Sequence, residues 1–144
     1  MLRWYTGAMD IPTALEFVRG NGHAVLATRR RDGEPQLSPV VAVVDDAGRV
    51  LVSTRETAMK ARNARRHPRA SLCVFTDRFF GPWVQVTGPV EIWSLPDAME
   101  PLVEYYRLAA GEHEDWDGYR EAMQHERRCL MVITPDEAGP TVSG

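Results

Sequence analysis

The segment that decides the fold is residues 83–93, which read WVQVTGPVEIW. Val84, Val86, Val90 and Ile92 fall on one parity, whereas the polar residues between them fall on the other. Such alternation is typical of a β-strand with one buried face. The glycine–proline pair in the middle of the segment predicts a bend or a bulge in that strand.

Further strand-like runs lie on both sides of this segment. They cover residues 24–29, 36–44, 49–54, 70–76 and 129–134. Short turn sequences, such as Asp32-Gly33, separate the first of these runs. Six strands in a mostly meandering order predict a closed or nearly closed antiparallel barrel, because closure leaves no exposed strand edges.

Helix signals interrupt the strands at four places. The first expected helix begins at Asp10 and has a proline in its first turn, and the second covers residues 57–66. The third opens with a capping box at Ser94 and ends at Gly111, and the fourth spans residues 115–125. The sequence therefore predicts a mainly β protein whose helices pack outside a barrel.

Length and composition indicate one globular domain. The chain has 144 residues, 44% of them apolar and 26% charged, with a net charge of −3. We expect residues 10–144 to form this domain and residues 1–9 to be a loose extension. The negative charge argues against nucleic-acid binding. No stretch is apolar and long enough for a membrane span or a signal peptide, so no membrane contact and a cytoplasmic location are expected.

The familiar catalytic and metal-binding motifs are absent from the sequence. It contains no GxGxxG after a strand, no P-loop, no GxSxG and no HExxH, and its histidines lack metal-ligand spacing. Cys73 and Cys129 lie in apolar runs without CxxC spacing, which favours buried thiols in a reducing compartment. The sequence thus predicts no metal site and leaves the catalytic residues unassigned.

The most informative local feature is a basic segment, residues 57–69, in an otherwise acidic chain. It places five cations within ten residues. At helical spacing, Lys60 and Asn63 share one face, and the arginines at 62, 65 and 66 share another.

Two interpretations of this segment are open. One is a solvated basic face near a helix C-terminus, where cations interact well with the helix dipole. The other is an anion site, in which free amides at the helix start, the hydroxyls of Ser53 and Thr54, and Lys60 bind a phosphate.

The order and spacing of several motifs resemble a known family. The motifs are AVLAT at 24–28, DGEPQLS at 32–38, KARNARRHPRAS at 60–71, YR at 106–107 and GEHEDWDGYREAM at 111–123. Together they resemble the flavin- and deazaflavin-binding split-barrel family related to pyridoxamine 5′-phosphate oxidase, in particular its branch that depends on coenzyme F420. The likeness extends over about residues 11 to 135.

This resemblance implies a six-stranded, antiparallel, Greek-key-like split β-barrel. It also implies a homodimer with a coenzyme, F420 or alternatively FMN, in each of two grooves at the subunit interface. The coenzyme-binding residues that it implies are Gln36, Ser38, Pro39, Ser53, Thr54, Arg55, Ala58, Met59, Lys60 and Arg62.

Each part of that set has its own implied role. Lys60 matches the family's phosphate-binding lysine, and residues 36–39 match the strand that lines the ring system. The arginines of the basic segment suit the acidic polyglutamyl tail of F420. Two positions depart from the family. Ala58 stands where relatives can carry an arginine that contacts the phosphate, and Arg55 would supply that contact instead. Pro39 stands where a polar residue is common, so only its backbone can contact the ring.

Three functions follow as alternatives from the resemblance. The first is a reductase that transfers a hydride from reduced F420 to a small conjugated or heteroaromatic acceptor. The others are an FMN-dependent oxidoreductase and a non-catalytic coenzyme-binding protein. Trp83, Tyr105 and Tyr106 are candidates for the acceptor side, and His113 is a candidate proton donor.

Overall fold

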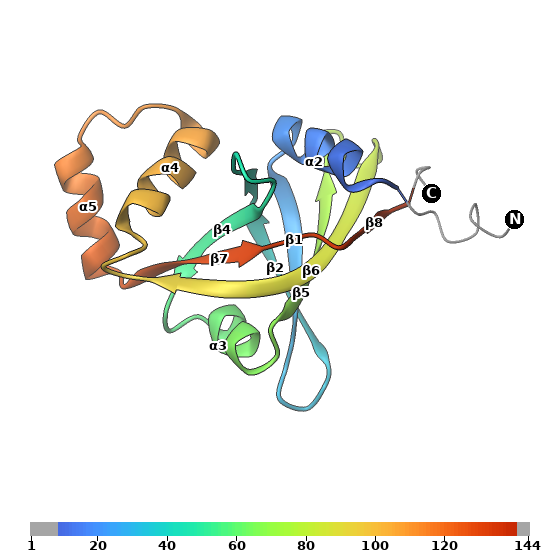
Figure 1. Ribbon diagram of the computed structural model, residues 1–144, viewed down its shortest axis with the longest axis horizontal. Helices are drawn as coiled ribbons and strands as arrows, with labels where there is room; N and C mark the ends of the chain where they lie inside the picture. Colours follow the sequence, from blue (N-terminus) through green and yellow to red (C-terminus); the bar gives the residue numbers. More distant parts are fainter. Residues whose placement is uncertain (1–8, 141–144) are drawn as a thin grey trace, which may run out of the picture.

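The computed structural model describes residues 9–140, and residues 1–8 of the expected N-terminal extension lie outside the described residues (Figure 1). The elements in chain order are α2 (Ile11–Gly20), β1 (His23–Arg29), β2 (Pro35–Val41), β3 (Val43–Val44), β4 (Val50–Arg55), α3 (Met59–Arg66), β5 (Arg69–Phe75), β6 (Trp83–Ser94), α4 (Met99–Ala110), α5 (Trp116–His125), β7 (Arg128–Ile133) and β8 (Glu137–Gly139).

The strands form one antiparallel sheet in the order β2-β1-β5-β6-β7-β4-β3, with β8 paired to β6. The two outer strands of this order, β2 and β3, are separated in the chain by Ala42 alone. The sheet must therefore curl until its ends meet. No ladder joins β2 to β4, so the barrel is split between them. This arrangement confirms the predicted split barrel with peripheral helices.

The run predicted at 36–44 is two strands rather than one. Ala42 is 1% exposed, and its amide donates to the carbonyl of Gly22 at 2.8 Å. The chain changes partner there, since β2 pairs with β1 and β3 pairs with β4. The short strand β8 was not predicted either.

Strand β6 is the longest strand and joins the two halves of the barrel. Its first part pairs with β5 and its last part with β7. This strand is curved in Figure 1, and its ladder with β5 continues through Gly88 without a skipped residue, so the alternative of a bulge was wrong. A Cβ atom on Gly88 would lie 2.0 Å from the carbonyl oxygen of Thr134. Glycine thus permits β6 and the segment after β7 to cross backbone to backbone.

The start of α2 agrees with the predicted cap, whereas the start of α4 does not. Asp10 accepts a hydrogen bond from the amide of Thr13 at 2.8 Å and caps α2, as predicted. Helix α4 begins at Met99, not near the capping box at Ser94. Ser94 is paired with Cys129 in the β6–β7 ladder, and this pairing keeps its backbone extended.

Two apolar clusters hold these elements together. The larger fills the barrel between the sheet and α2 and includes Leu26, Leu72 and Met131. The second lies between α4, α5 and the outer side of β4 and β7, and includes Leu102 and Leu130. Helix α3 contacts β1 and β6 at the end of the barrel away from α2 (Figure 1). Its placement beside the split positions the candidate site.

Candidate functional site

A groove of about 750 Å³, called here the split pocket, lies where the barrel is open between β2 and β4. Strands β1, β2 and β4, the start of α3, and single residues of β5, α4 and β7 line it. These residues are His23, Ala24, Pro39, Val40, Val41, Ser53, Thr54, Arg55, Thr57, Ala58, Lys60, Phe75, Tyr105 and Arg128. Because no strand closes this gap, the split itself creates the site.

One end of the split pocket is suited to an anion. The N-cap of α3, Ala58, makes no side-chain hydrogen bond to the first helical amides. The amides of Met59 and Lys60, in the first turn, have no acceptor within the helix. Lys60 is the only lysine of the chain, and it has no carboxylate partner within residues 9–140. Amides at a helix start together with a free ammonium group favour a phosphate.

Two arginines add positive charge to this end. Arg55 and Arg128 are cross-strand neighbours, and both approach Glu126, at 3.2 Å and 3.8 Å. Nε of Arg128 is buried and has no hydrogen-bond partner among the described residues. Arg55 and Arg128 therefore share one carboxylate while Lys60 has none, which leaves a net positive charge for a ligand to balance.

The other end of the split pocket is largely apolar. Pro39, Val40 and Val41 form one side, and Phe75 contributes from β5. Tyr105 covers the pocket from α4, and its hydroxyl donates to the carbonyl of Val41 at 2.8 Å. Burial raises the pKa of this hydroxyl, so it remains a neutral donor. A flat apolar group next to an anion site is what this pocket can hold.

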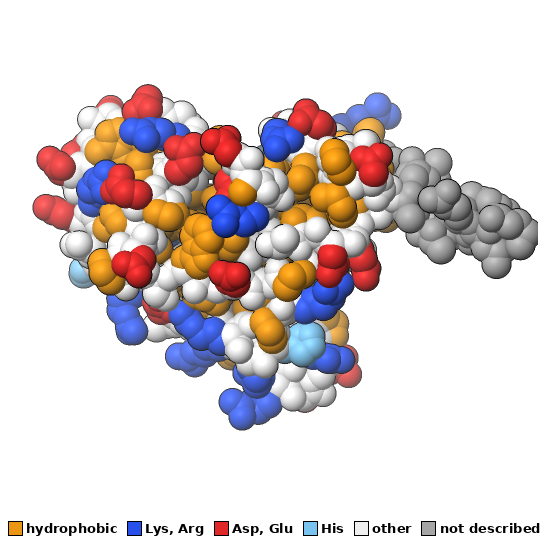
Figure 2. All heavy atoms as spheres, in the orientation of Figure 1, with side chains coloured by type: hydrophobic (Ala, Val, Ile, Leu, Met, Phe, Trp, Pro, Cys, Tyr) orange, Lys and Arg blue, Asp and Glu red, His pale blue; other side chains and the backbone are white. Residues whose placement is uncertain are grey.

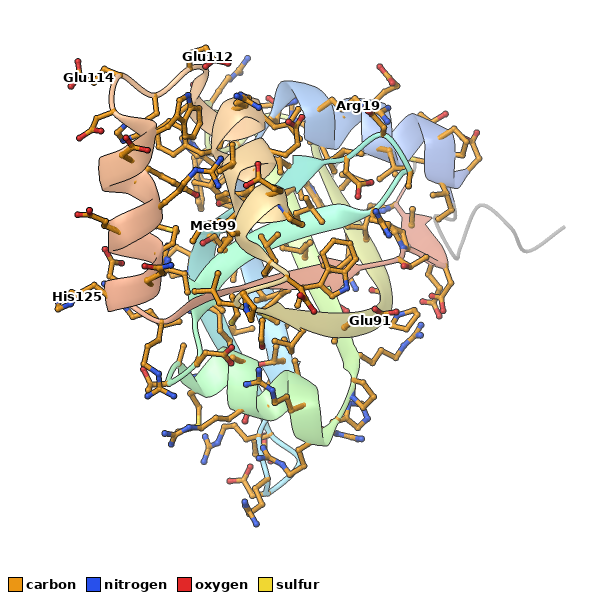
Figure 3. The ribbon with its side chains drawn as sticks, turned by 60° about the vertical axis from the view of Figure 1, so that its left-hand side comes forward. Arg19, Glu91, Met99, Glu112, Glu114 and His125 are labelled. Carbon is orange, nitrogen blue, oxygen red and sulfur yellow. The ribbon has the colours of Figure 1, made fainter. Side chains whose placement is uncertain are left out.

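A second groove, of about 1,110 Å³, lies on the other side of α3 and is called here the basic groove. Its lining residues are Arg30, Arg31, Asp32, Gln36, Met59, Arg62, Asn63, Arg65 and Arg66. Figure 2 shows Lys and Arg side chains gathered over this end of the molecule, around α3 and the β1–β2 hairpin. Figure 3 shows Glu112 and Glu114 at the opposite end of the molecule.

The arginines of the basic groove are not equally available. Arg65 pairs with Glu56 and also donates to Ser94. Burial works to raise the pKa of Glu56, but hydrogen bonds from Ser94 and Arg65 outweigh it and hold that pKa below its usual value. Glu56 is therefore ionised and forms a salt bridge with Arg65, which makes Arg65 less available to a ligand. Within the described residues, Arg62 has no such carboxylate.

Asn63 connects α3 to the β1–β2 hairpin beneath the basic groove. It is fully buried, and its amide donates to the hydroxyl of Thr28 at 3.2 Å and to Oε1 of Gln36 at 3.0 Å. Its own oxygen accepts from Arg66 at 2.7 Å. Gln36 is thus held by its oxygen, which leaves its NH₂ group as a donor toward a ligand.

The structure distributes the predicted coenzyme-binding residues over both grooves. Pro39, Ser53, Thr54, Arg55, Ala58 and Lys60 line the split pocket, and Gln36, Met59 and Arg62 line the basic groove. Ser38 lines neither of them. Arg62, Arg65 and Arg66 share one side of α3 as expected, whereas Lys60 and Asn63 belong to different grooves.

Some lining residues were missed, and some candidates lie elsewhere. His23, Phe75 and Arg128 reach the split pocket through strand pairing, for which the sequence carries no local signal. Tyr106 and His113 pack together at 4.9 Å between ring centroids, in an aromatic cluster with residues of α5. They do not line the split pocket, and neither does Trp83.

The two cysteines carry free thiols, one partly buried (Cys73) and one buried (Cys129). Burial raises the pKa of both thiols, that of Cys129 to about 11. Within residues 9–140, no three His, Cys, Asp or Glu side chains are placed to hold a metal ion. None of the helices described combines the length and hydropathy of a membrane-spanning segment.

Comparison with known proteins supports this picture of the fold. The sequence profile of the family "Pyridoxamine 5′-phosphate oxidase" matches residues 11–141. A conserved hypothetical protein from Mycobacterium tuberculosis superposes with a TM-score of 0.72 at 26% identity, over 90% of this chain and 82% of that one. A structure named F420 reductase superposes with a TM-score of 0.67 at 20% identity, over 87% of this chain and 94% of that one. A putative pyridoxamine 5′-phosphate oxidase from Listeria innocua superposes with a TM-score of 0.64 at 14% identity, over 89% of this chain and 94% of that one.

Proposed function

Because the chain belongs to the pyridoxamine 5′-phosphate oxidase family and has its flavin-binding oxidoreductase fold, we propose that it is a reductase that uses coenzyme F420. The coenzyme ring and phosphate occupy the split pocket, and the acidic tail occupies the basic groove. The reduced coenzyme supplies a hydride to a small conjugated or heteroaromatic acceptor.

The observation that carries this proposal is the adjacency of the two grooves. Ala58 and Lys60 line the split pocket, while Met59 and Arg62 line the basic groove, so the two grooves lie on either side of the first turn of α3. A ligand with a flat ring, a phosphate and a chain of carboxylates has a matching surface for each part. FMN would use the split pocket and leave the basic groove without a ligand.

The residues of the split pocket have distinct roles in this function. Lys60 and the first amides of α3 hold the phosphate, and Arg55 and Arg128 strengthen the local positive potential. The apolar side excludes water from the reacting face, which favours hydride transfer over side reactions. Tyr105, with its raised pKa, stays protonated and fixes the end of β2 through Val41. Protein groups thus bind and orient, whereas the coenzyme carries the redox chemistry.

The outer face of the barrel supports a homodimer. Its cross-strand neighbours are Pro39, Val25, Cys73 and Gln85 in one row, and Leu37, Ala27, Ser71 and Thr87 in the next. Leu37, on the edge strand β2, is 63% exposed, and Val41, further along that strand, is 40% exposed. This face, apolar on β1 and β2 and polar on β5 and β6, continues into the split pocket at Pro39. A two-fold partner on it would cover both the face and the pocket.

The test is a parallel fluorescence titration of the protein with oxidised F420 and with FMN. We expect tighter binding of F420, and a steeper loss of F420 affinity as salt is raised, because the tail contacts are exposed to solvent. Preference for FMN, or equal salt dependence for both ligands, would contradict the F420 proposal. Binding of F420 without reduction of any acceptor would favour the non-catalytic alternative.

The variant Lys60→Ala tests the phosphate end. Loss of one charged hydrogen bond should weaken F420 binding by about 1.5–3 kcal/mol, roughly 10- to 150-fold. Arg19→Ala is the matched control, since Arg19 lies on α2, away from both grooves (Figure 3). Because Lys60 is the only lysine of the chain, acylation of lysine reports on this site alone, and bound F420 should protect Lys60 from it. Unchanged affinity and unprotected acylation would remove Lys60 from the site.

A further inference from the structure

The loop between β5 and β6 carries the two most exposed large apolar side chains of the described residues. Phe79 is 75% exposed and Phe80 is 89% exposed. Exposing phenyl rings to water is unfavourable in free energy, so two neighbouring exposed rings mark a contact surface. The folded chain itself buries only a small part of this pair.

The exposed pair is connected to the wall of the split pocket. The ring of Phe79 packs edge-on against Phe75, with 6.3 Å between centroids, and Phe80 packs edge-on against Phe79 at 5.1 Å. Phe75 lines the pocket. In the same loop, Oδ1 of Asp77 lies 3.2 Å from Nδ1 of His23, which also lines the pocket. The three phenyl rings therefore extend the apolar side of the pocket outward.

Hydrogen bonds hold the backbone of the loop that carries this pair in a tight turn. The carbonyl of Arg78 accepts hydrogen bonds from the hydroxyl of Thr76 and from the amide of Gly81, both at 2.8 Å. A Cβ atom on Gly81 would lie 2.5 Å from that hydroxyl, so the turn closes tightly only around glycine. A preorganised surface of this kind costs little entropy when a ligand binds it.

We propose that Phe79 and Phe80 form the apolar wall of the acceptor subsite and select a planar, uncharged ring compound such as a quinone. This inference rests on the proposed function, since the acceptor binds beside the coenzyme. Edge-to-face phenyl rings offer a planar ring both a flat surface and an edge. The charges of Asp77 and Arg78 oppose each other, so the loop favours neither an anion nor a cation.

The experiment measures binding of menadione, an uncharged planar naphthoquinone, through quenching of tryptophan fluorescence. Trp83 is the cross-strand neighbour of Phe75 and reports on the loop. The double variant Phe79→Ser, Phe80→Ser should bind menadione about tenfold or more weakly, as expected when a ligand loses an apolar wall. Its affinity for F420 and FMN should not change.

Two further variants make the result specific. Leu108→Ser removes another exposed apolar side chain, one on α4 outside the split pocket, and should leave menadione affinity unchanged. Phe80→Tyr keeps an aromatic ring and should retain most of the affinity. Because Phe79 and Phe80 are mainly exposed, their replacement leaves the core intact.

Four outcomes would overturn the inference. They are undetectable menadione binding to the unaltered protein, unchanged menadione affinity in the double variant, a parallel loss of coenzyme affinity, and conversion of a dimer to a monomer by the double variant. The last would assign the loop to a contact between copies. Loop-dependent menadione binding in a protein that binds neither F420 nor FMN would contradict the proposed function and leave the subsite standing.

Discussion

Replacing Asn63 by alanine should lower the free energy of unfolding by more than the loss of one small side chain would. Asn63 is fully buried and makes hydrogen bonds to Thr28, Gln36 and Arg66. Thr28 is only 3% exposed, so water cannot readily replace the lost donor. Each hydrogen bond contributes about 0.5–1.5 kcal/mol net, and a buried group left without a partner costs about 1–3 kcal/mol. We therefore expect a loss of about 2–4 kcal/mol in the free energy of unfolding.

The assay is urea unfolding followed by circular dichroism at a fixed protein concentration, because association would make stability depend on concentration. Gln124→Ala, at an exposed position of α5, is the control and should change stability by less than about 0.5 kcal/mol. A double-mutant cycle of Asn63→Ala with Thr28→Val should give a coupling of about 0.5–1.5 kcal/mol. A loss below about 1 kcal/mol for Asn63→Ala, or zero coupling, would refute this reasoning.

Three further predictions concern packing, assembly and pH. Gly88→Ala should cost at least about 3 kcal/mol in urea unfolding, because the new Cβ meets the backbone at Thr134; a loss within about 1 kcal/mol would show that the crossing can open. Leu37→Lys should raise the dimer dissociation constant at least about tenfold in sedimentation, whereas Leu108→Lys should not; an unchanged dimer would place the interface elsewhere. Stability should fall between pH 9 and pH 11, since the unfolded chain loses the proton of Cys129 near 9 and the folded chain keeps it until about 11. The slope from this thiol is at most about 1.4 kcal/mol per pH unit, and a slope that Cys129→Ala does not reduce would contradict its assignment.

Much of the fold was predictable because its signals are local. The alternation in residues 83–93 defines β6, and the cap at Asp10 defines the start of α2. Both depend on residues a few positions apart, where periodicity and capping act. The basic helix α3 was predictable for the same reason, since Lys60 and the arginines stand within two helical turns of one another.

Only the tertiary structure divided that basic helix between two grooves. Lys60 faces the split pocket and Arg62 the basic groove, while Arg65 is occupied by Glu56. The sequence treats these cations alike, because it does not show which carboxylates the fold brings near. Glu56 lies nine positions before Arg65, too far for a local signal.

The sequence by itself predicted most of the strands and helices, and it marked Lys60 and the start of α3 as the candidate phosphate site. The tertiary structure alone decided that Ala42 breaks a strand, that Arg128 stands beside Arg55, and that Phe75 connects the pocket to an exposed aromatic loop. The physical reason is that local structure depends on neighbours in the chain, whereas strand register depends on burying one face of every strand at once. Which side chains from distant strands meet at the split is a result of that register.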